Sequence, residues 1–135
     1  MSDCIFCNIA AGTMKAEVVF ESPHAIGFLD KYPVTRGHVV VIPRVHAATL
    51  NDLADDAVGG LFLAVKAVMR QVTDALRPVA MNVGWNHGKD AGQVVLHLHV
   101  HVLPRYSAGG HGVQALGEGA SQVSFPELAE AIRKA

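Results

Sequence analysis

Histidines alternate with apolar residues between positions 96 and 103, and this run constrains the chain more than any other segment. Side chains that alternate along an extended chain point to opposite faces of a strand, so His97, His99 and His101 share one face. The opposite face carries only leucine and valine and is expected to be buried. The sequence therefore predicts a strand over residues 94–103 with an apolar face in the core and a histidine face that carries chemistry.

The histidine face permits three interpretations. The imidazoles could merely be tolerated on a wet sheet face, although three of them in strict alternation are improbable because histidine has only ordinary strand propensity. They could converge on a catalytic zinc ion, since three imidazoles form such sites. They could instead supply a nucleophile, because a neutral imidazole, with a pKa of about 6.5 when unperturbed, can attack an electrophile at neutral pH.

The loop before this strand favours the nucleophile. Gly88, Ala91 and Gly92 allow close approach to the backbone, so the N–H groups of Gly92, Gln93 and Val94 are expected to cradle a phosphate beside the histidines. Donors in that position would stabilise the charge that develops on the non-bridging oxygens in the transition state.

The overall composition limits the class of protein. The chain has 135 residues, of which 50% are hydrophobic, and we expect a single domain over residues 1–135 with a variable C-terminal segment over 107–135. A formal net charge of −1 argues against binding to nucleic acid, because that requires clustered Lys and Arg. We also expect no membrane partner, because no apolar run reaches roughly 18 residues, and a cytoplasmic location, because the first residues lack the features of a secretory signal.

The pattern of apolar and turn residues predicts an α+β fold. Apolar residues recur every three or four positions between residues 55 and 76, which indicates one long amphipathic helix that Pro78 ends. Short terminal helices are expected over residues 5–11, where Gly12 follows, and after residues 124–127, which have the spacing of a capping box. Strands are expected over residues 18–20, 25–29, 38–42, 81–85 and 94–103, and short links between strands indicate a mainly antiparallel sheet.

The only two cysteines of the chain, Cys4 and Cys7, are three positions apart. In a reducing compartment this spacing points to metal or redox chemistry before a structural disulfide.

The triad and its surroundings resemble a known family. Residues 97–101, preceded by Asn86, Gly88 and the Ala91-Gly92-Gln93 triplet, resemble the histidine-triad (HIT) nucleotide-binding family. The resemblance extends from the N-terminus to about Tyr106 and includes residues 4–7, 28–30, 37–38, 41–43 and His46. It implies a HIT-like α+β fold.

The resemblance also implies roles for individual residues. In that family the middle histidine, here His99, attacks the α-phosphate of a nucleotide and carries a nucleotidyl group that water later removes. The last histidine, here His101, contacts the phosphate and helps the leaving group depart. The implied phosphate neighbours are Asn86, Gln93 and the amides of Gly92 and Val94.

Further residues match the family's nucleoside site. Asp30 matches an acidic residue that accepts hydrogen bonds from the ribose hydroxyls, although it could also be an ordinary turn aspartate before residues 31–33. Phe6, Ile9 and Phe28 resemble the apolar slot that holds a purine, and each could equally be an ordinary core residue.

A structural zinc ion is implied as well. Cys4, Cys7, His46 and His97 match the zinc ligands of the branch of the family that carries Cys-x-x-Cys, and two thiolates with two imidazoles satisfy tetrahedral zinc. His97 would then be a ligand rather than a catalyst. The alternative is that the cysteines are free and pack as small apolar residues.

The function that the resemblance implies is hydrolysis of a nucleotide conjugate, such as a nucleoside phosphoramidate, an adenylate or a dinucleoside polyphosphate, with a purine preferred. The family also implies a symmetric homodimer. Two alternatives stay open: a purine-nucleotide-binding regulatory module without catalysis, and a metallohydrolase that uses all three histidines.

Overall fold

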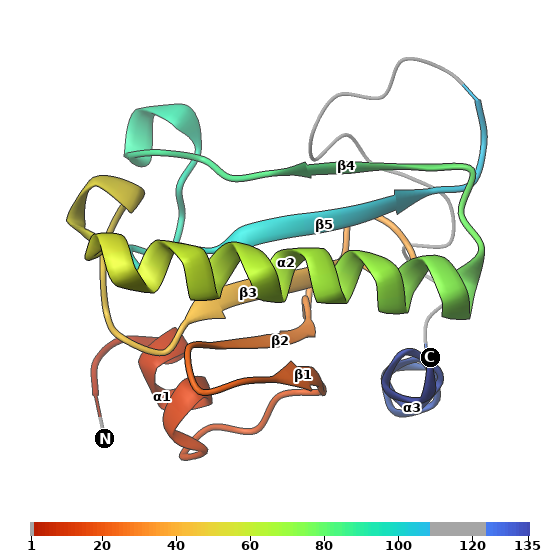
Figure 1. Cartoon of the computed structure of the whole chain (residues 1–135), viewed down its shortest axis with the longest axis horizontal. Coiled ribbons are helices and arrows are strands. Elements are labelled where there is room, and N and C mark those ends of the chain that lie inside the picture. The colour runs from red at the N-terminus through yellow and green to blue at the C-terminus, as the bar shows by residue number, and fades with distance from the viewer. Residues whose placement is uncertain (1, 109–123) are drawn as a thin grey trace.

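One antiparallel sheet with helices on both faces forms the framework of the chain (Figure 1). The computed structural model describes residues 2–108 and 124–135. Within these residues the strand order is β1-β2-β3-β5-β4, and each neighbouring pair is antiparallel. The elements are α1 (Ile5–Ala11), β1 (Val18–Glu21), β2 (Ala25–Leu29), β3 (Val39–Pro43), α2 (Asp55–Leu76), β4 (Ala80–Gly84), β5 (Val100–Arg105) and α3 (Phe125–Lys134), with 3-10 turns at Leu50–Asp52 and Lys89–Ala91. The α+β class is therefore confirmed.

Helix α2 runs across one face of the sheet, with the bounds that the apolar periodicity predicts (Figure 1). Its buried stripe packs on the sheet and comprises Leu61, Ala64, Val65, Val68 and Val72. The helix ends at Arg77, which takes a left-handed conformation before Pro78. Because the stripe is buried within the chain itself, it gives no argument for a homodimer.

The alternation of β2 and β3 divides their side chains between the two faces of the sheet. The face under α2 receives Ala25, Leu29, Val39 and Val41. The opposite face receives Ile26, Phe28, Val40 and Ile42, which form a second apolar cluster with Phe6 and Ile9 of α1. In the register of the sheet Phe28 lies opposite Val40, and Val40 lies opposite His101. An imidazole of β5 is thereby placed beside the apolar cluster of α1.

The histidine strand is shorter than the alternation predicts. Strand β5 begins at Val100, and residues 94–99 form no ladder with β3 or β4. The cause lies in Pro43 at the end of β3, which has no N–H to donate and whose carbonyl accepts from the His97 ring at 2.9 Å. Leu98 still joins Val100 in the core under α2, held by its N–H to the Ala47 carbonyl at 2.8 Å. The predicted division into an apolar face and a histidine face is therefore confirmed.

Smaller differences concern the ends of elements. Strand β3 begins at Val39, one residue later than expected, and β4 covers residues 80–84 rather than 81–85. Helix α3 forms as expected, but the Ser124 side chain makes no capping hydrogen bond. Residues 109–123 of the expected variable C-terminal segment lie outside the described residues. No helix in the described part of the chain is long and apolar enough to cross a membrane.

Replacing Gly37 with alanine is expected to destabilise the fold by about 2 kcal/mol or more, through a left-handed backbone and an overpacked contact. Gly37 has φ +86°, and a Cβ there would overlap the Leu76 side chain and approach Pro104 Cγ to 3.2 Å. The matched control is Gly59→Ala, because Gly59 lies inside α2 with nothing within 4 Å of the added Cβ. That change should stabilise the fold by about 0.5–1 kcal/mol. Urea unfolding measures both, and equal stability of the two variants would contradict the description of this turn.

Candidate functional site

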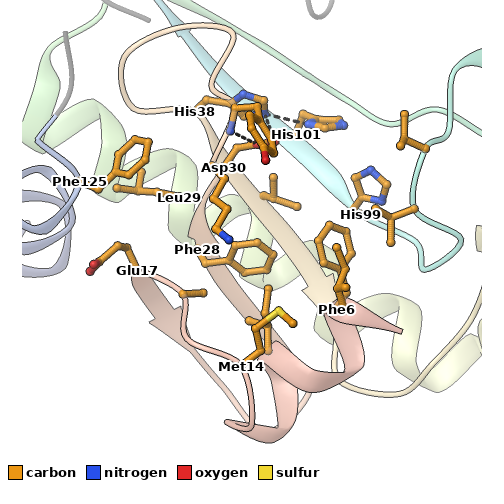
Figure 2. Close-up of a pocket in the computed structure, with 18 of the residues that line it drawn as sticks. Phe6, Met14, Glu17, Phe28, Leu29, Asp30, His38, His99, His101 and Phe125 are labelled. Carbon is orange, nitrogen blue, oxygen red and sulfur yellow. Dashed lines mark hydrogen bonds and ion pairs between the residues drawn. The ribbon is translucent and has the colours of Figure 1, made fainter. Parts of the chain in front are cut away.

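A cavity of about 660 Å³ lies between α1, the strands β2 and β3, and the loop before β5. Figure 2 shows its two kinds of lining: Phe6, Met14 and Phe28 on one side, and a polar group of Asp30, His38 and His101 on another. His99 and Phe125, the latter from α3, lie at opposite ends of this view. The cavity therefore combines an apolar slot with titratable groups.

The apolar slot is built around the Phe6 ring. Its centroid lies 5.5 Å from that of Phe28 and 5.1 Å from that of His99, both in edge-on arrangements. Phe6 and Ile9 are each 9% exposed and Phe28 is 4% exposed, so the three are core residues that also line the cavity. A flat aromatic ligand could pack against them by stacking and edge contacts.

The hydrogen bonds of His99 determine which of its ring nitrogens carries the proton. Its Nδ1 lies 2.8 Å from the backbone carbonyl of His97, and a carbonyl can only accept, so Nδ1 donates. Burial lowers the pKa of His99, although the bond to this carbonyl and the charge of Asp30 act in the opposite direction. The neutral ring then carries its lone pair on Nε2, which is the arrangement that a nucleophile needs.

A chain of hydrogen bonds likewise orients His101. The Val34 N–H donates to Nδ1 of His38 at 3.1 Å, so the proton of the neutral His38 ring is on Nε2. Nε2 of His38 lies 2.9 Å from Nδ1 of His101 and donates to it, which places the proton of neutral His101 on its own Nε2. Burial, with smaller contributions from neighbouring charges, lowers the pKa of His38 to about 3 and that of His101 to about 4. Both rings are therefore neutral donors at neutral pH.

His38 is a site residue that sequence reasoning left unassigned. It is 1% exposed and lies immediately before β3, while its partner His101 is 63 positions further along the chain. Only the register of β3 against β5 brings them together. The one signal in the sequence was its place in the resemblance, next to Gly37.

Asp30 is a turn residue that also lines the cavity. Its Oδ1 accepts from the Tyr32 N–H at 2.8 Å, as in a turn aspartate, and the residue also lines the cavity. Its Oδ2 lies 3.5 Å from Nε2 of His38, which is a weak polar contact because His38 is neutral. Burial raises the pKa of Asp30. The carboxylate can still accept a hydrogen bond from a ligand in the cavity.

Cys4, Cys7, His46 and His97 come together on the other side of α1. Their ligating atoms all lie within 4.8 Å of one another. Nδ1 of His97 lies 3.4 Å from Cys4 Sγ and 3.5 Å from Cys7 Sγ, and Nδ1 of His46 lies 3.3 Å from Cys7 Sγ. Ligand atoms on tetrahedral zinc are roughly 3.3–3.8 Å apart, so these separations fit the ion.

The tautomer of His97 also fits a metal ligand. Its Nε2 donates to the Pro43 carbonyl at 2.9 Å, which leaves the lone pair on Nδ1, the nitrogen that faces the thiols. His97 therefore belongs with the cysteines, away from His99 and His101. Among the described residues, His97 groups with the cysteines and His101 groups with Asp30 and His38 as possible metal ligands. No such group combines the three histidines of the run, so the geometry gives no support to the three-histidine metallohydrolase.

The loop before β5 does not provide the three-amide cradle that we expected. The Gly92 N–H donates to the Lys89 carbonyl at 2.9 Å, and the Gln93 N–H donates to the Gly88 carbonyl at 3.1 Å. Both amides are committed within the loop. Within the described residues the Val94 N–H donates no hydrogen bond, and Val94 lines the cavity.

The side chain of Gln93 is a clamp inside the loop rather than part of the cavity wall. It is 3% exposed, accepts from the Gly88 N–H at 2.8 Å, and donates to the carbonyls of Ala48 and Val95 at 2.6 and 3.0 Å. Asn86 likewise bonds within the loop, donating to the Gly92 carbonyl at 3.3 Å. Their placement supports a role in shaping the loop.

Acidification from pH 6.5 to about 4 is expected to lower the free energy of unfolding. The buried rings of His38 and His101 have lowered pKa values of about 3 and about 4, whereas in the unfolded chain they take up protons near pH 6.5. In this window the unfolded state binds more protons, so the stabilisation present above pH 6.5 is lost as the pH falls. Urea unfolding midpoints at several pH values measure the slope.

The variant His38→Gln serves as the comparison, because it removes one titrating ring while keeping a side-chain N–H. Its dependence on pH should be shallower than that of the unmodified chain. Effects that both proteins share, such as loss of a metal in acid, cancel in the comparison. Parallel slopes would show that His38 is not held neutral in the folded state.

Comparison with known proteins places this arrangement in a family. The pattern of the HIT domain matches residues 11–108 of the chain. Protein hit from Bacillus subtilis is 39% identical over 107 residues, which cover 79% of this chain and 74% of that protein. The adenosine 5'-monophosphoramidase hnt1 of Schizosaccharomyces pombe is 34% identical over 130 residues, which cover 96% of this chain and 90% of that protein.

A solved structure agrees in fold over nearly the whole chain. The zinc-bound histidine triad family protein from Mycobacterium smegmatis superposes with a TM-score of 0.84 at 30% identity, covering 98% of this chain and 91% of that one. The expected HIT-like fold is thereby confirmed.

Proposed function

This chain belongs to the HIT domain family, and on that premise we propose that it is a hydrolase of purine nucleotide conjugates that acts through a nucleotidyl-histidine intermediate at His99. The observation that carries the proposal is the hydrogen bond from Nδ1 of His99 to the His97 carbonyl, at 2.8 Å. It leaves the Nε2 lone pair of a neutral, half-buried ring beside an apolar slot. The adenosine monophosphoramidase activity named for the fission yeast relative agrees with it.

The reaction has two steps. In the first, Nε2 of His99 attacks the α-phosphorus of the conjugate, forming a P–N bond while the bond to the leaving group breaks. In the second, water attacks the same phosphorus, the P–N bond breaks, a nucleoside monophosphate is released and neutral His99 is regenerated. The proton that the water loses balances the proton that the leaving group takes up from solvent. The intermediate divides one difficult displacement into two easier ones.

His101 is proposed to assist both steps as a hydrogen-bond donor. Its ring lies 5.0 Å from that of His99, and its Nδ1 already accepts from His38. The proton on Nε2 can therefore be offered to a non-bridging oxygen or to the departing atom. Its pKa of about 4 favours donation of a hydrogen bond by the neutral ring over storage of a positive charge.

The remaining contacts of the substrate follow from the lining of the cavity. We propose that Phe6, Ile9 and Phe28 hold the purine and that Asp30 accepts from the ribose hydroxyls. The Val94 N–H is the proposed phosphate donor of the loop before β5, which Gln93 and Asn86 shape from within. Gly92 also lines the cavity, although its N–H is committed to the Lys89 carbonyl.

We propose zinc as the metal of the four-residue cluster. The donor set of two thiols and two imidazoles, their spacing and the tautomer of His97 all fit it, and the relative from Mycobacterium smegmatis is zinc-bound. With four protein ligands the coordination of the ion is closed, so its contribution is structural. It would connect the N-terminal segment to the residues before β5.

A homodimer and a cytoplasmic location stay predictions. Within the described residues β4 is an edge strand of the sheet, and Leu63 and Trp85 are exposed apolar side chains. An exposed sheet edge with apolar side chains nearby is suited to pairing with a second copy. Sedimentation analysis would test the dimer.

The function is tested by following AMP release from adenosine monophosphoramidate, an acyl adenylate and diadenosine tetraphosphate in parallel. We expect turnover of at least one of these, and the ratio of kcat/KM between them identifies the preferred leaving group. Binding of AMP without release from any conjugate would favour the non-catalytic nucleotide-binding module.

A further inference from the structure

Helix α1 is shared between the cavity and the metal cluster. Cys4, at its N-terminus, and Cys7, in its first turn, belong to the metal cluster, whereas Phe6 and Ile9 line the apolar slot. We propose that metal and nucleotide bind this chain cooperatively, because the metal holds α1 in the position where it forms one wall of the nucleoside slot. The inference rests on the proposed nucleotide site.

The short length of α1 makes it dependent on such support. It has seven residues, and isolated helices shorter than about 12–15 residues are marginal in water. Its N-terminal turn is capped by Cys4 Sγ, which accepts from the Cys7 N–H at 3.4 Å, so the capping atom is itself a candidate metal ligand. Binding of a metal would therefore fix the first turn of the helix directly.

Few polar contacts tie α1 to the rest of the chain. Asn8 bonds to Ser2 in the same N-terminal segment, in both directions, at 2.8 and 2.9 Å. From outside this segment, Arg44 Nη1 donates to the Ala10 carbonyl at 3.2 Å. Among the described residues, the other attachments of α1 are the apolar cluster and the contacts of the two cysteines with histidines. Loss of the metal would thus remove the direct tie between the first turn of α1 and the two histidines.

His97 carries the same coupling to the reacting end of the site. Its ring Nδ1 faces the thiols and its Nε2 donates to the Pro43 carbonyl, while its own backbone carbonyl accepts from His99 Nδ1. Residues 94–99 lie outside the β5 ladder, so few backbone hydrogen bonds hold them in place. The Phe6 ring joins the two ends, at 6.0 Å from the His97 ring and 5.1 Å from the His99 ring.

Binding equilibria that are linked in this way must be reciprocal. If metal raises the affinity for AMP by some factor, AMP raises the affinity for the metal by the same factor. Coupling between sites typically amounts to about 5- to 150-fold, and we expect about 10-fold here because one of several walls of the slot is involved.

The experiment measures the factor in both directions. The AMP affinity of the zinc-loaded and zinc-stripped chain is determined by calorimetry, and the zinc affinity with and without saturating AMP by competition with a chromophoric chelator. Hydrogen exchange reports whether stripping exposes the amides of α1 alone or those of β3 as well. We expect about 10-fold weaker AMP binding after stripping, a matching increase in zinc affinity with AMP, and loss of protection confined to α1.

Two variants distinguish the contribution of α1 to AMP binding from that of the rest of the nucleotide site. Phe6→Ala keeps all four metal ligands but removes the ring that joins the sites, so the coupling factor should fall to about 2 or less. Asp30→Asn weakens a contact that α1 does not carry, so AMP should bind less tightly to both forms with the coupling factor unchanged.

The outcomes distinguish this inference from the proposed function. Equal AMP affinity of the loaded and stripped chains overturns the coupling and leaves the nucleotide site intact. If removal of the metal exposes the amides of β3 as well as those of α1 to exchange, the metal stabilises the whole fold. That outcome also overturns the coupling through α1. Failure of AMP and its conjugates to bind the loaded chain overturns the proposed function and this inference with it.

Discussion

Replacing His99 with alanine is expected to reduce kcat for the preferred nucleotide conjugate by about 10⁴-fold or more, because the variant lacks the ring that forms the proposed covalent intermediate. Nε2 of His99 is the ring nitrogen left with a lone pair when Nδ1 donates to the His97 carbonyl. AMP should still bind the variant within a few-fold of the unmodified chain, because most of the apolar slot is unchanged. Steady-state kinetics and calorimetry measure the two quantities separately.

The control for this variant is His24→Ala, since His24 is an exposed histidine that does not line the cavity. It should leave kcat and KM unchanged. An alanine variant of His99 that retains more than about a tenth of kcat would be incompatible with covalent catalysis by this residue.

Replacing Cys7 with serine is expected to remove the metal and to lower the melting temperature by about 10 °C or more, since binding of a structural zinc contributes directly to folding. Cys7 Sγ contacts both His46 and His97, so its loss disrupts the cluster at its centre. Metal content per chain and a thermal melt measure the two effects. The unmodified chain should carry about one zinc and the variant almost none.

The variant His87→Ala provides the comparison, because this histidine lies in the loop before β5 and outside the metal cluster. Its metal content should equal that of the unmodified chain. If Cys7→Ser melted at the same temperature as the unmodified chain, the cysteines would be free residues that pack without a metal.

Local signals in the sequence were sufficient for the helices. The bounds of α2 follow from its apolar period and from Pro78, and those of α1 from Gly12, because a helix start or stop depends on a few neighbouring residues. The period of two likewise identified which side chains of β5 are buried. The period could not show where the ladder between β3 and β5 ends, because the Pro43 carbonyl accepts a hydrogen bond from the His97 ring, which is distant in the sequence.

Partners of polar side chains were harder to predict than their positions. The resemblance drew attention to Gln93, but only the fold shows that its amide bonds to three backbone groups, two in the loop before β5 and one at Ala48, far away in the sequence. His38 was missed because its hydrogen-bond partner, His101, lies on another strand and is far away in the sequence. Residue type indicates what a group can bind, whereas tertiary contacts decide what it does bind.

The most direct test of the account is the intact mass of the chain after brief incubation with the preferred adenylyl conjugate. Samples are quenched at neutral pH and in acid, because a P–N bond to histidine survives the first and is hydrolysed in the second. Nucleophilic catalysis by His99 predicts a mass increase of one adenylyl group at neutral pH that disappears in acid and is absent from His99→Ala. Release of AMP with no such adduct under single-turnover conditions, or an adduct that persists in His99→Ala, would contradict nucleophilic catalysis by His99.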